Sequence, residues 1–269
     1  MPYVEVPGGR LYYETAGSPA APALLLIHQG VANLRMWDEQ VAAFAREHFV
    51  VRYDARGFGL SETEDVAFSP SGDIRALLDR LGVASVAIIA NSQGGNFAFD
   101  LALESPERVR GLMAIGSACS GFPELPLTAE EEAGFARLDR LYAAADWPAL
   151  ARGEVELWNL RSDGSPLDPA FVQRAYALNE ANLPHAAERP TRVPIDPPAY
   201  GRLGELRIPV LAAVGEWDLS EAHTQAKHFA AVIPGAEFHV FPRAAHLPSV
   251  QHPAEFEAVA LDWLGRHGL

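Results

Sequence analysis

The chain has 269 residues, of which 49% are hydrophobic and 21% are charged, so it can bury a large core and is not composed like a disordered protein. Its formal net charge of −14 argues against nucleic acid or an anionic membrane as a partner, because both require basic patches. A single cysteine rules out an internal disulfide. With no signal-peptide pattern, and no apolar run near the roughly 18 to 20 residues that span a bilayer, we expect a cytoplasmic protein.

Short apolar runs alternate with amphipathic stretches along most of the chain. A β-hairpin is expected first, from residues 4–6 and 11–14. Apolar runs typical of strands buried on both faces follow at 23–28, 49–54, 86–91, 111–116, 209–215 and 237–242. Helical spacing separates them, and in the last helix Pro253 suits the first turn and Gly265 or Gly268 the end. This alternation predicts an α/β fold, with a mostly parallel sheet flanked by helices.

One stretch interrupts the alternation. From about 120 to 200 no good strand pattern is present, and helical patterns and prolines dominate. We therefore predict an α/β core of residues 1–119 and 201–269, with a mostly helical cap inserted at 120–200. The insertion contains thirteen Asp or Glu and seven Arg, which makes it a poor general attractor for anionic substrates and favours neutral ones.

Three reactive side chains follow the ends of predicted strands. Ser92 follows the run 86–91, Asp218 follows 209–215, and His246 comes shortly after 237–242. Ligands bind at the carboxyl ends of parallel strands, so these side chains are expected to share one edge of the sheet. A serine hydroxyl becomes a strong nucleophile when a histidine removes its proton and a carboxylate orients that histidine. The chain order Ser, Asp, His on an alternating α/β pattern indicates nucleophilic hydrolysis.

Each of these assignments has an alternative close by. Glu216 could replace Asp218, although an outward orientation toward solvent is expected for it. His252 could replace His246, although its place next to a proline favours the surface. His28, at the end of the run 23–28, is expected to brace the loop that follows.

Two other kinds of site are excluded by their patterns. Gly57 and Gly59 follow a strand as in a dinucleotide fingerprint, but Glu62 occupies the third position, where a small residue is needed. The nine histidines are scattered, and the chain has neither a His-Glu-x-x-His sequence nor a cysteine pair, so no metal site is expected. We predict no cofactor.

Five segments together resemble the α/β-hydrolase superfamily over essentially the whole chain. They are "LLLIHQG", "RYDARGFGLS", "ANSQGG", "VGEWD" and "AAHLPSVQHPAEF". The resemblance implies that Ser92 is the nucleophile, Asp218 the acid and His246 the base. It also implies that the backbone N–H groups of Gly30 and Gln93 form the oxyanion hole, the pair of donors that stabilises a negatively charged substrate oxygen.

The chain departs from the family pattern at two positions. Ala90 replaces the first glycine of the nucleophile turn, and Gln29 stands where the family mostly has glycine. Gln29 is therefore expected beside the substrate. Cys119 is a second candidate for the pocket wall, with inert packing as its alternative. Trp147 and Trp158 are candidates to face the substrate from the cap, with packing inside the cap as their alternative.

These features predict a serine hydrolase that acts on a small, mostly apolar ester or lactone. The sequence around Asn91 resembles carbon–carbon bond hydrolases of aromatic degradation, and the histidine loop resembles enol-lactone hydrolases and cofactor-free haloperoxidase or perhydrolase relatives. A non-enzymatic ligand receptor on the same fold is the alternative from another class. The partner is expected to be a small-molecule substrate, and a homo-oligomer is left open.

Overall fold

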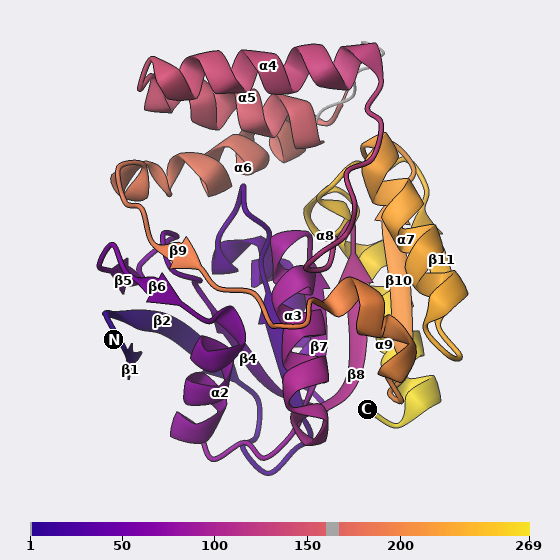
Figure 1. Cartoon of the computed structure of the whole chain (residues 1–269). Helices are drawn as coiled ribbons and strands as arrows, with labels where there is room; N and C mark the ends of the chain where they lie inside the picture. Colours follow the sequence, from indigo (N-terminus) through magenta and orange to yellow (C-terminus); the bar gives the residue numbers. More distant parts are fainter. Residues whose placement is uncertain (1, 160–166) are drawn as a thin grey trace.

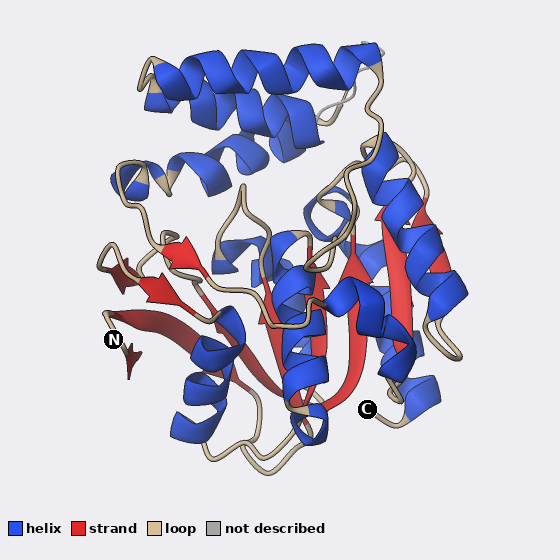
Figure 2. Ribbon diagram, viewed as in Figure 1, coloured by secondary structure: helices blue, strands red, loops and turns tan. Residues whose placement is uncertain are grey.

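A twisted sheet forms the centre of the molecule (Figure 2). The computed structural model describes residues 2–159 and 167–269, and these contain a nine-stranded sheet. Its strands are β1 (Tyr3–Val6), β2 (Gly9–Ala16), β3 (Ala23–Ile27), β4 (Phe49–Tyr53), β5 (Glu62–Thr63), β7 (Val86–Asn91), β8 (Val109–Ile115), β10 (Val210–Gly215) and β11 (Glu237–Phe241). The order is β1-β2-β4-β3-β7-β8-β10-β11, with β5 paired to β2. From β4 to β11 all neighbours are parallel, whereas β2 is antiparallel to β1, β4 and β5, which confirms the predicted opening hairpin and mostly parallel sheet.

Helices cover both faces of the sheet, as predicted. Side chains of α2 (Pro70–Arg80), α3 (Gln93–Glu104) and α7 (Ser220–Val232) pack into one apolar core. Side chains of α1 (Asp38–Phe44), α8 (Pro248–Gln251) and α9 (Pro253–His267) pack into the other. Because successive strand residues point to opposite faces, Leu25 joins the first core and Leu26 the second. The described residues also form four 3₁₀ helices: η1 (Leu34–Trp37), η2 (Pro106–Arg108), η3 (Leu183–His185) and η4 (Ala199–Glu205).

Three helices from the middle of the chain lie over the ends of the strands (Figure 1). They are α4 (Ala129–Ala143), α5 (Trp147–Asn159) and α6 (Pro169–Glu180), and α5 packs between the other two. The predicted lack of strands in 120–200 is wrong at one point, because β9 (Thr191–Arg192) pairs with β6 (Ala67–Phe68) of the core. A two-residue strand has no periodicity, so only its distant partner reveals it. Residues 160–166 of the predicted insertion lie outside the described residues.

One local prediction needs correction, and the structure decides between the two alternatives of another. β11 is not buried on both faces, since Phe238 is 41% and Val240 37% exposed. Among the described strands it ends the sheet order and pairs with β10 alone, so it lies at an edge. In the last helix Gly268 rather than Gly265 provides the end, with the left-handed φ of 62° that glycine adopts easily. Within the described ranges, no helix has the length and apolar character needed to cross a membrane.

Candidate active site

Ser92 occupies a strained turn between a buried strand and a helix. β7 is buried along its whole length, and Ser92 follows with φ 53° and ψ −117° before α3 begins. The Ser92 N–H donates to the Ile115 carbonyl at 2.7 Å, which fixes the turn against β8. A Cβ on Gly94 would lie 2.8 Å from the Ile27 carbonyl oxygen, so only glycine fits there. The strain therefore persists because the surrounding packing holds the turn, as is common at functional sites.

Asp218 and His246 form a buried pair. His246 Nδ1 lies 2.8 Å from Asp218 Oδ1 and 2.9 Å from Oδ2, and the two side chains are 2% and 0% exposed. Gly116 makes room for them, because a Cβ there would lie 2.7 Å from Asp218 Oδ2. A carboxylate only accepts hydrogen bonds, so a neutral His246 carries its proton on Nδ1 and leaves Nε2 as an acceptor.

Ser92 and His246 line the same small cavity of about 150 Å³. Its lining residues are Gln29, Gly30, Val31, Ser92, Gln93, Trp158 and His246. Among the described residues Ser92 Oγ and His246 form no direct hydrogen bond. The indole of Trp158, from α5, packs on the imidazole with ring centroids 4.8 Å apart. The helices above the sheet thus contribute directly to this site.

The alternative acid and base lie outside this cavity. Glu216 Oε2 accepts a hydrogen bond from the Arg243 N–H at 2.7 Å. His252 Nε2 donates to the Arg243 carbonyl at 2.9 Å. Both side chains therefore fix the loop that carries His246 and do not reach the imidazole.

Gly30 and Gln93 bring two free backbone donors to the small cavity. Gln93 is the first residue of α3, where a backbone N–H has no acceptor within the helix. In the described part of the chain, neither the Gly30 nor the Gln93 N–H has a protein acceptor. The two segments lie close together, since a Cβ on Gly30 would be 3.5 Å from Gln93 Oε1.

Gln29 directs its side chain toward α5. It is fully buried, and its Nε2 donates to Asn159 Oδ1 at a long 3.5 Å, while its Oε1 has no partner in the described chain. Gln29 thus connects the turn after β3 to α5 while lining the small cavity.

His28 has a structural environment, as the sequence predicts. Its Nδ1–H donates to the Gln29 carbonyl at 2.7 Å, and its Nε2 accepts from the Ala55 N–H at 2.9 Å. Burial lowers the pKa of His28 to about 4, so the ring stays neutral near pH 7. Both nitrogens are occupied, and His28 braces the turn after β3 against the loop after β4.

The chain is similar to known proteins over most of its length. A family model described as the alpha/beta hydrolase fold matches residues 22–253. The chain belongs to the α/β-hydrolase family. A Streptomyces sp. (strain C5) protein, rhodomycin D methylesterase DauP, is 31% identical, with 88% of this chain and 91% of that protein covered. A 2-hydroxy-6-oxononadienedioate/2-hydroxy-6-oxononatrienedioate hydrolase of Comamonas testosteroni is 27% identical, with 95% and 91% covered. The solved enol-lactonase of Burkholderia xenovorans LB400 shares the fold, with a TM-score of 0.78 and 24% identity, over 98% of this chain and 100% of that one.

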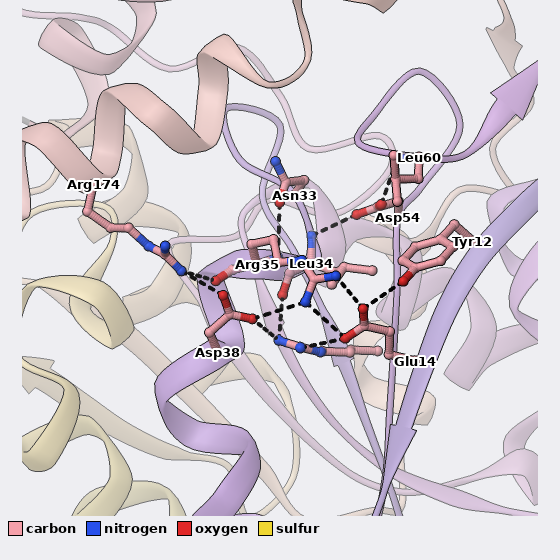
Figure 3. A network of polar contacts seen from close by, with 10 residues as sticks. Tyr12, Glu14, Asn33, Leu34, Arg35, Asp38, Asp54, Leu60 and Arg174 are labelled. Carbon is pink, nitrogen blue, oxygen red and sulfur yellow. Dashed lines mark hydrogen bonds and ion pairs between the residues drawn. The ribbon is translucent and has the colours of Figure 1, made fainter. Parts of the chain in front are cut away.

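In this α/β hydrolase, buried polar groups hold the turn after β3 (Figure 3). Asp54 accepts from the backbone N–H groups of Leu34 and Leu60, each at 2.8 Å. Burial raises the pKa of Asp54 to about 6. From the turn itself, Asn33 donates to the Leu178 carbonyl of α6 at 2.9 Å.

An ion-pair cluster below that turn also joins the hydrolase core to α6. Arg52 pairs with Glu14 and with Asp38, each at 2.6 Å. Arg174, from α6, pairs with Asp38 at 2.9 Å, and Figure 3 shows it reaching down from the helix. The contacts of Asp38 with Arg52 and Arg174 therefore connect β4 to α6.

Asn182, just after α6, links two loops of the hydrolase. Its Nδ2 donates to the Ala32 carbonyl at 3.0 Å, and its Oδ1 accepts from the Gly59 N–H at 2.9 Å. Ala32 belongs to the turn after β3, and Gly59 to the loop after β4. One amide thereby fixes the relative position of both loops.

A larger cavity of about 330 Å³ in the hydrolase also includes Ser92 in its wall. Trp158 lines both cavities, whereas Cys119 and Trp147 are absent from the described lining of either. Cys119 is buried in the core, and burial raises the pKa of its thiol to about 12. Trp147 packs on Tyr142 of α4, with ring centroids 5.6 Å apart.

Several polar residues of the larger cavity were missed by the sequence analysis. Asn96 and Asp100 follow Ser92 at intervals of four, so helical spacing could have placed them on the same face of α3. Arg192 also lines this cavity. It belongs to the two-residue β9, which has no periodic signal. In the described chain, no group of three or more His, Cys, Asp or Glu side chains is arranged to hold a metal ion.

Proposed function

We propose that this α/β hydrolase is a serine hydrolase that cleaves a small, mostly apolar ester or lactone. The observation that carries the proposal is the buried Asp218–His246 hydrogen bond beside the cavity that Ser92 enters from its strained turn. A nucleophile, a base and an orienting acid on three separate strand ends are the components of a catalytic triad.

In the proposed reaction, Ser92 Oγ attacks the substrate carbonyl carbon and His246 Nε2 takes its proton. Asp218 holds the proton on Nδ1 and stabilises the imidazolium that forms. His246 then gives its proton to the leaving alcohol, and an acyl group remains on Ser92. Water, activated by His246, releases the acid and restores the serine. Hydrogen bonds from the nucleophile to the base often tighten only when substrate is bound.

The backbone N–H groups of Gly30 and Gln93 are the proposed oxyanion donors. Both lack a protein acceptor in the described chain and both border the small cavity that contains Ser92. Donors already fixed in place stabilise the developing charge without reorganisation, and losing one typically costs roughly 10²- to 10³-fold in kcat.

Gln29→Gly tests whether the Gln29 side chain belongs to this oxyanion hole. Its amide points to Asn159, so we expect kcat on 4-nitrophenyl butyrate to fall less than about tenfold. Loss of the buried contact should reduce the free energy of unfolding by about 1 kcal/mol. Steady-state kinetics and urea unfolding measure the two effects. A fall of roughly 10²-fold or more in kcat at unchanged stability would instead make the amide an oxyanion donor.

The dimensions of the site support a small substrate. The cavities that include Ser92 measure about 150 and 330 Å³, at or below the lower end of the roughly 300 to 1,000 Å³ usual for ligand pockets. We also propose that residues 120–200 act as a cap over the core, with α4, α5 and α6 enclosing the substrate and Trp158 in contact with His246. The reaction as written needs water and no cofactor.

A second candidate is hydrolysis of a carbon–carbon bond. It is supported by relatives named 2-hydroxy-6-oxononadienedioate/2-hydroxy-6-oxononatrienedioate hydrolase, one of them 27% identical over 95% of this chain. The same serine and histidine could serve both reactions, so the substrate must decide between them.

Active-site labelling and rapid kinetics test the proposed function. A fluorophosphonate should modify one serine, and peptide mass spectrometry should place the label on Ser92. Mixing with 4-nitrophenyl butyrate should give a burst of nitrophenol close to the enzyme concentration, because the acyl group stays on the serine. A ring-cleavage dienone tested alongside should remain intact. Label on another residue would contradict the assignment, and rapid dienone cleavage with negligible ester turnover would favour the carbon–carbon reaction.

A further inference from the structure

Arg192 places a positive charge beside the proposed nucleophile. It lies on β9, on the segment that returns from α6 to the core, and its side chain lines the 330 Å³ cavity that includes Ser92. Its Nη2 donates to Gln93 Oε1, next in the chain to Ser92. Its Cζ also lies 5.2 Å from the centroid of the Phe97 ring, which is close enough for a cation–π contact.

The guanidinium of Arg192 has no carboxylate partner among the residues that the structure describes. Within the described ranges no carboxylate oxygen lies within ion-pair distance of it, whereas Arg174 of α6 is paired with Asp38. A guanidinium offers five N–H donors, and Gln93 Oε1 is its one described acceptor. Most of its donors are therefore free for a ligand.

The side chain of Arg192 is accessible, although protein surrounds part of it. The residue is exposed, yet burial lowers the pKa of its guanidinium from the ordinary value. Both observations are expected for a side chain in the wall of an open cavity. The surrounding protein removes part of the hydration of the guanidinium, and the rest of the side chain faces the cavity. An unpaired guanidinium in such a place can offer its N–H donors to an anion that enters the cavity, and charge-assisted hydrogen bonds of this kind are the stronger ones.

Two carboxyl groups share this cavity and need to be considered. Asp100 accepts from Ser120 Oγ at 2.7 Å and from the Ile195 N–H at 3.5 Å, and burial raises its pKa. Burial, followed by the charge of Glu131, raises the pKa of Glu221. Among the described ion pairs neither carboxyl group is paired with Arg192, and Asp100 is already engaged by Ser120 and Ile195.

We infer that Arg192 binds a carboxylate of the substrate, so that the preferred ester or lactone carries one carboxylate on an otherwise small apolar framework. This inference rests on the proposed function and names the substrate class of the same site. Arginine suits this role because its planar fork holds both oxygens of a carboxylate. The negative net charge of residues 120–200 does not prevent such binding. In the described lining of the 330 Å³ cavity, Arg192 is the single basic side chain.

The test compares two esters that differ in charge. Mono-4-nitrophenyl adipate carries a carboxylate at the end of its acyl chain, and 4-nitrophenyl hexanoate has the same chain length without it. The measured quantity is the ratio of kcat/KM for the adipate ester to kcat/KM for the hexanoate ester. Arg192→Gln should lower this ratio roughly 10- to 100-fold, mainly through a higher KM for the adipate ester. Arg192→Lys should retain part of it, because the charge remains while the fork is lost.

Arg189→Gln is the matched control. Arg189 lies three residues away in the same segment, but its guanidinium packs over Tyr142 and Trp147 outside the cavity. We expect the ratio to stay within about twofold of the wild type, and thermal unfolding to verify the fold of every variant. Should Arg192→Gln unfold, the wild-type ratio supplies the test, since a carboxylate subsite requires it to exceed one and to fall as salt screens the charge.

The outcomes separate this inference from the proposed function. If both esters are cleaved and the ratio is the same in wild type and Arg192→Gln, the carboxylate subsite is wrong and the serine hydrolase stands. If an alcohol-side pair, 3-carboxyphenyl butyrate and phenyl butyrate, shows the Arg192-dependent preference, the subsite holds on the leaving-group side. If the wild type cleaves none of these esters and takes no fluorophosphonate label, the proposed function fails and the subsite fails with it.

Discussion

Replacing Ser92 with alanine is expected to lower kcat on 4-nitrophenyl butyrate by at least roughly 10⁴-fold. Without Oγ no acyl-enzyme can form, and only substrate binding and the Gly30 and Gln93 N–H groups remain to assist water. Alanine adds no atoms at the strained turn, and Ser92 Oγ has no described hydrogen-bond partner, so the fold should persist. Steady-state kinetics, fluorophosphonate labelling and thermal unfolding measure these effects.

Ser249→Ala is the control for this result. Ser249 is also buried, and its Oγ has no described hydrogen-bond partner, but it lies on α8 and lines neither of the cavities that include Ser92. This variant should be labelled and should turn over ester like the wild type. Continued labelling of the Ser92→Ala protein would show that another residue is the nucleophile.

Asp218→Asn is expected to lower kcat on 4-nitrophenyl butyrate by roughly 10⁴-fold. The fluorophosphonate should still label Ser92, but more slowly than in the wild type. An asparagine amide can donate to His246 Nδ1, which would move the ring proton to Nε2 and leave no base facing Ser92. The effect should appear in kcat rather than in KM, since Asp218 lies behind the imidazole. A pH–rate profile measured alongside should show loss of the wild-type basic group.

Glu216→Gln separates the acid from its neighbour in the same turn. Glu216 bonds to the Arg243 N–H, so the amide should preserve the loop and kcat should change less than about threefold. If Glu216→Gln lost activity and Asp218→Asn retained it, the assignment of the acid would be reversed.

The fold could be predicted because its signals are local. Each central strand is a short apolar run, and the helices between them show helical spacing, so the mostly parallel sheet followed from pattern alone. The expected positions of Ser92, Asp218 and His246 followed for a related reason. Side chains at the carboxyl ends of parallel strands meet at one edge, whatever the length of the intervening chain.

Features that depend on distant partners could not be predicted in this way. The exposure of Phe238 depends on the position of β11 at the edge of the sheet, which its own residues do not indicate. Trp158 and Trp147 looked equivalent in sequence, yet only Trp158 reaches His246, because the packing of α5 decides which of them turns inward. The place of Arg192 in the cavity depends on the pairing of β9 with β6.

Asn182 has a consequence for engineering chimaeras from related hydrolases. Its amide holds the turn after β3 and the loop after β4 together, while Arg174 anchors α6 to Asp38. Exchanging residues 120–200 for the equivalent segment of another protein would remove both anchors along with part of the wall of the cavities that include Ser92. Such a hybrid would change its turnover number as well as its selectivity. Grafts that retain these two side chains should isolate selectivity alone.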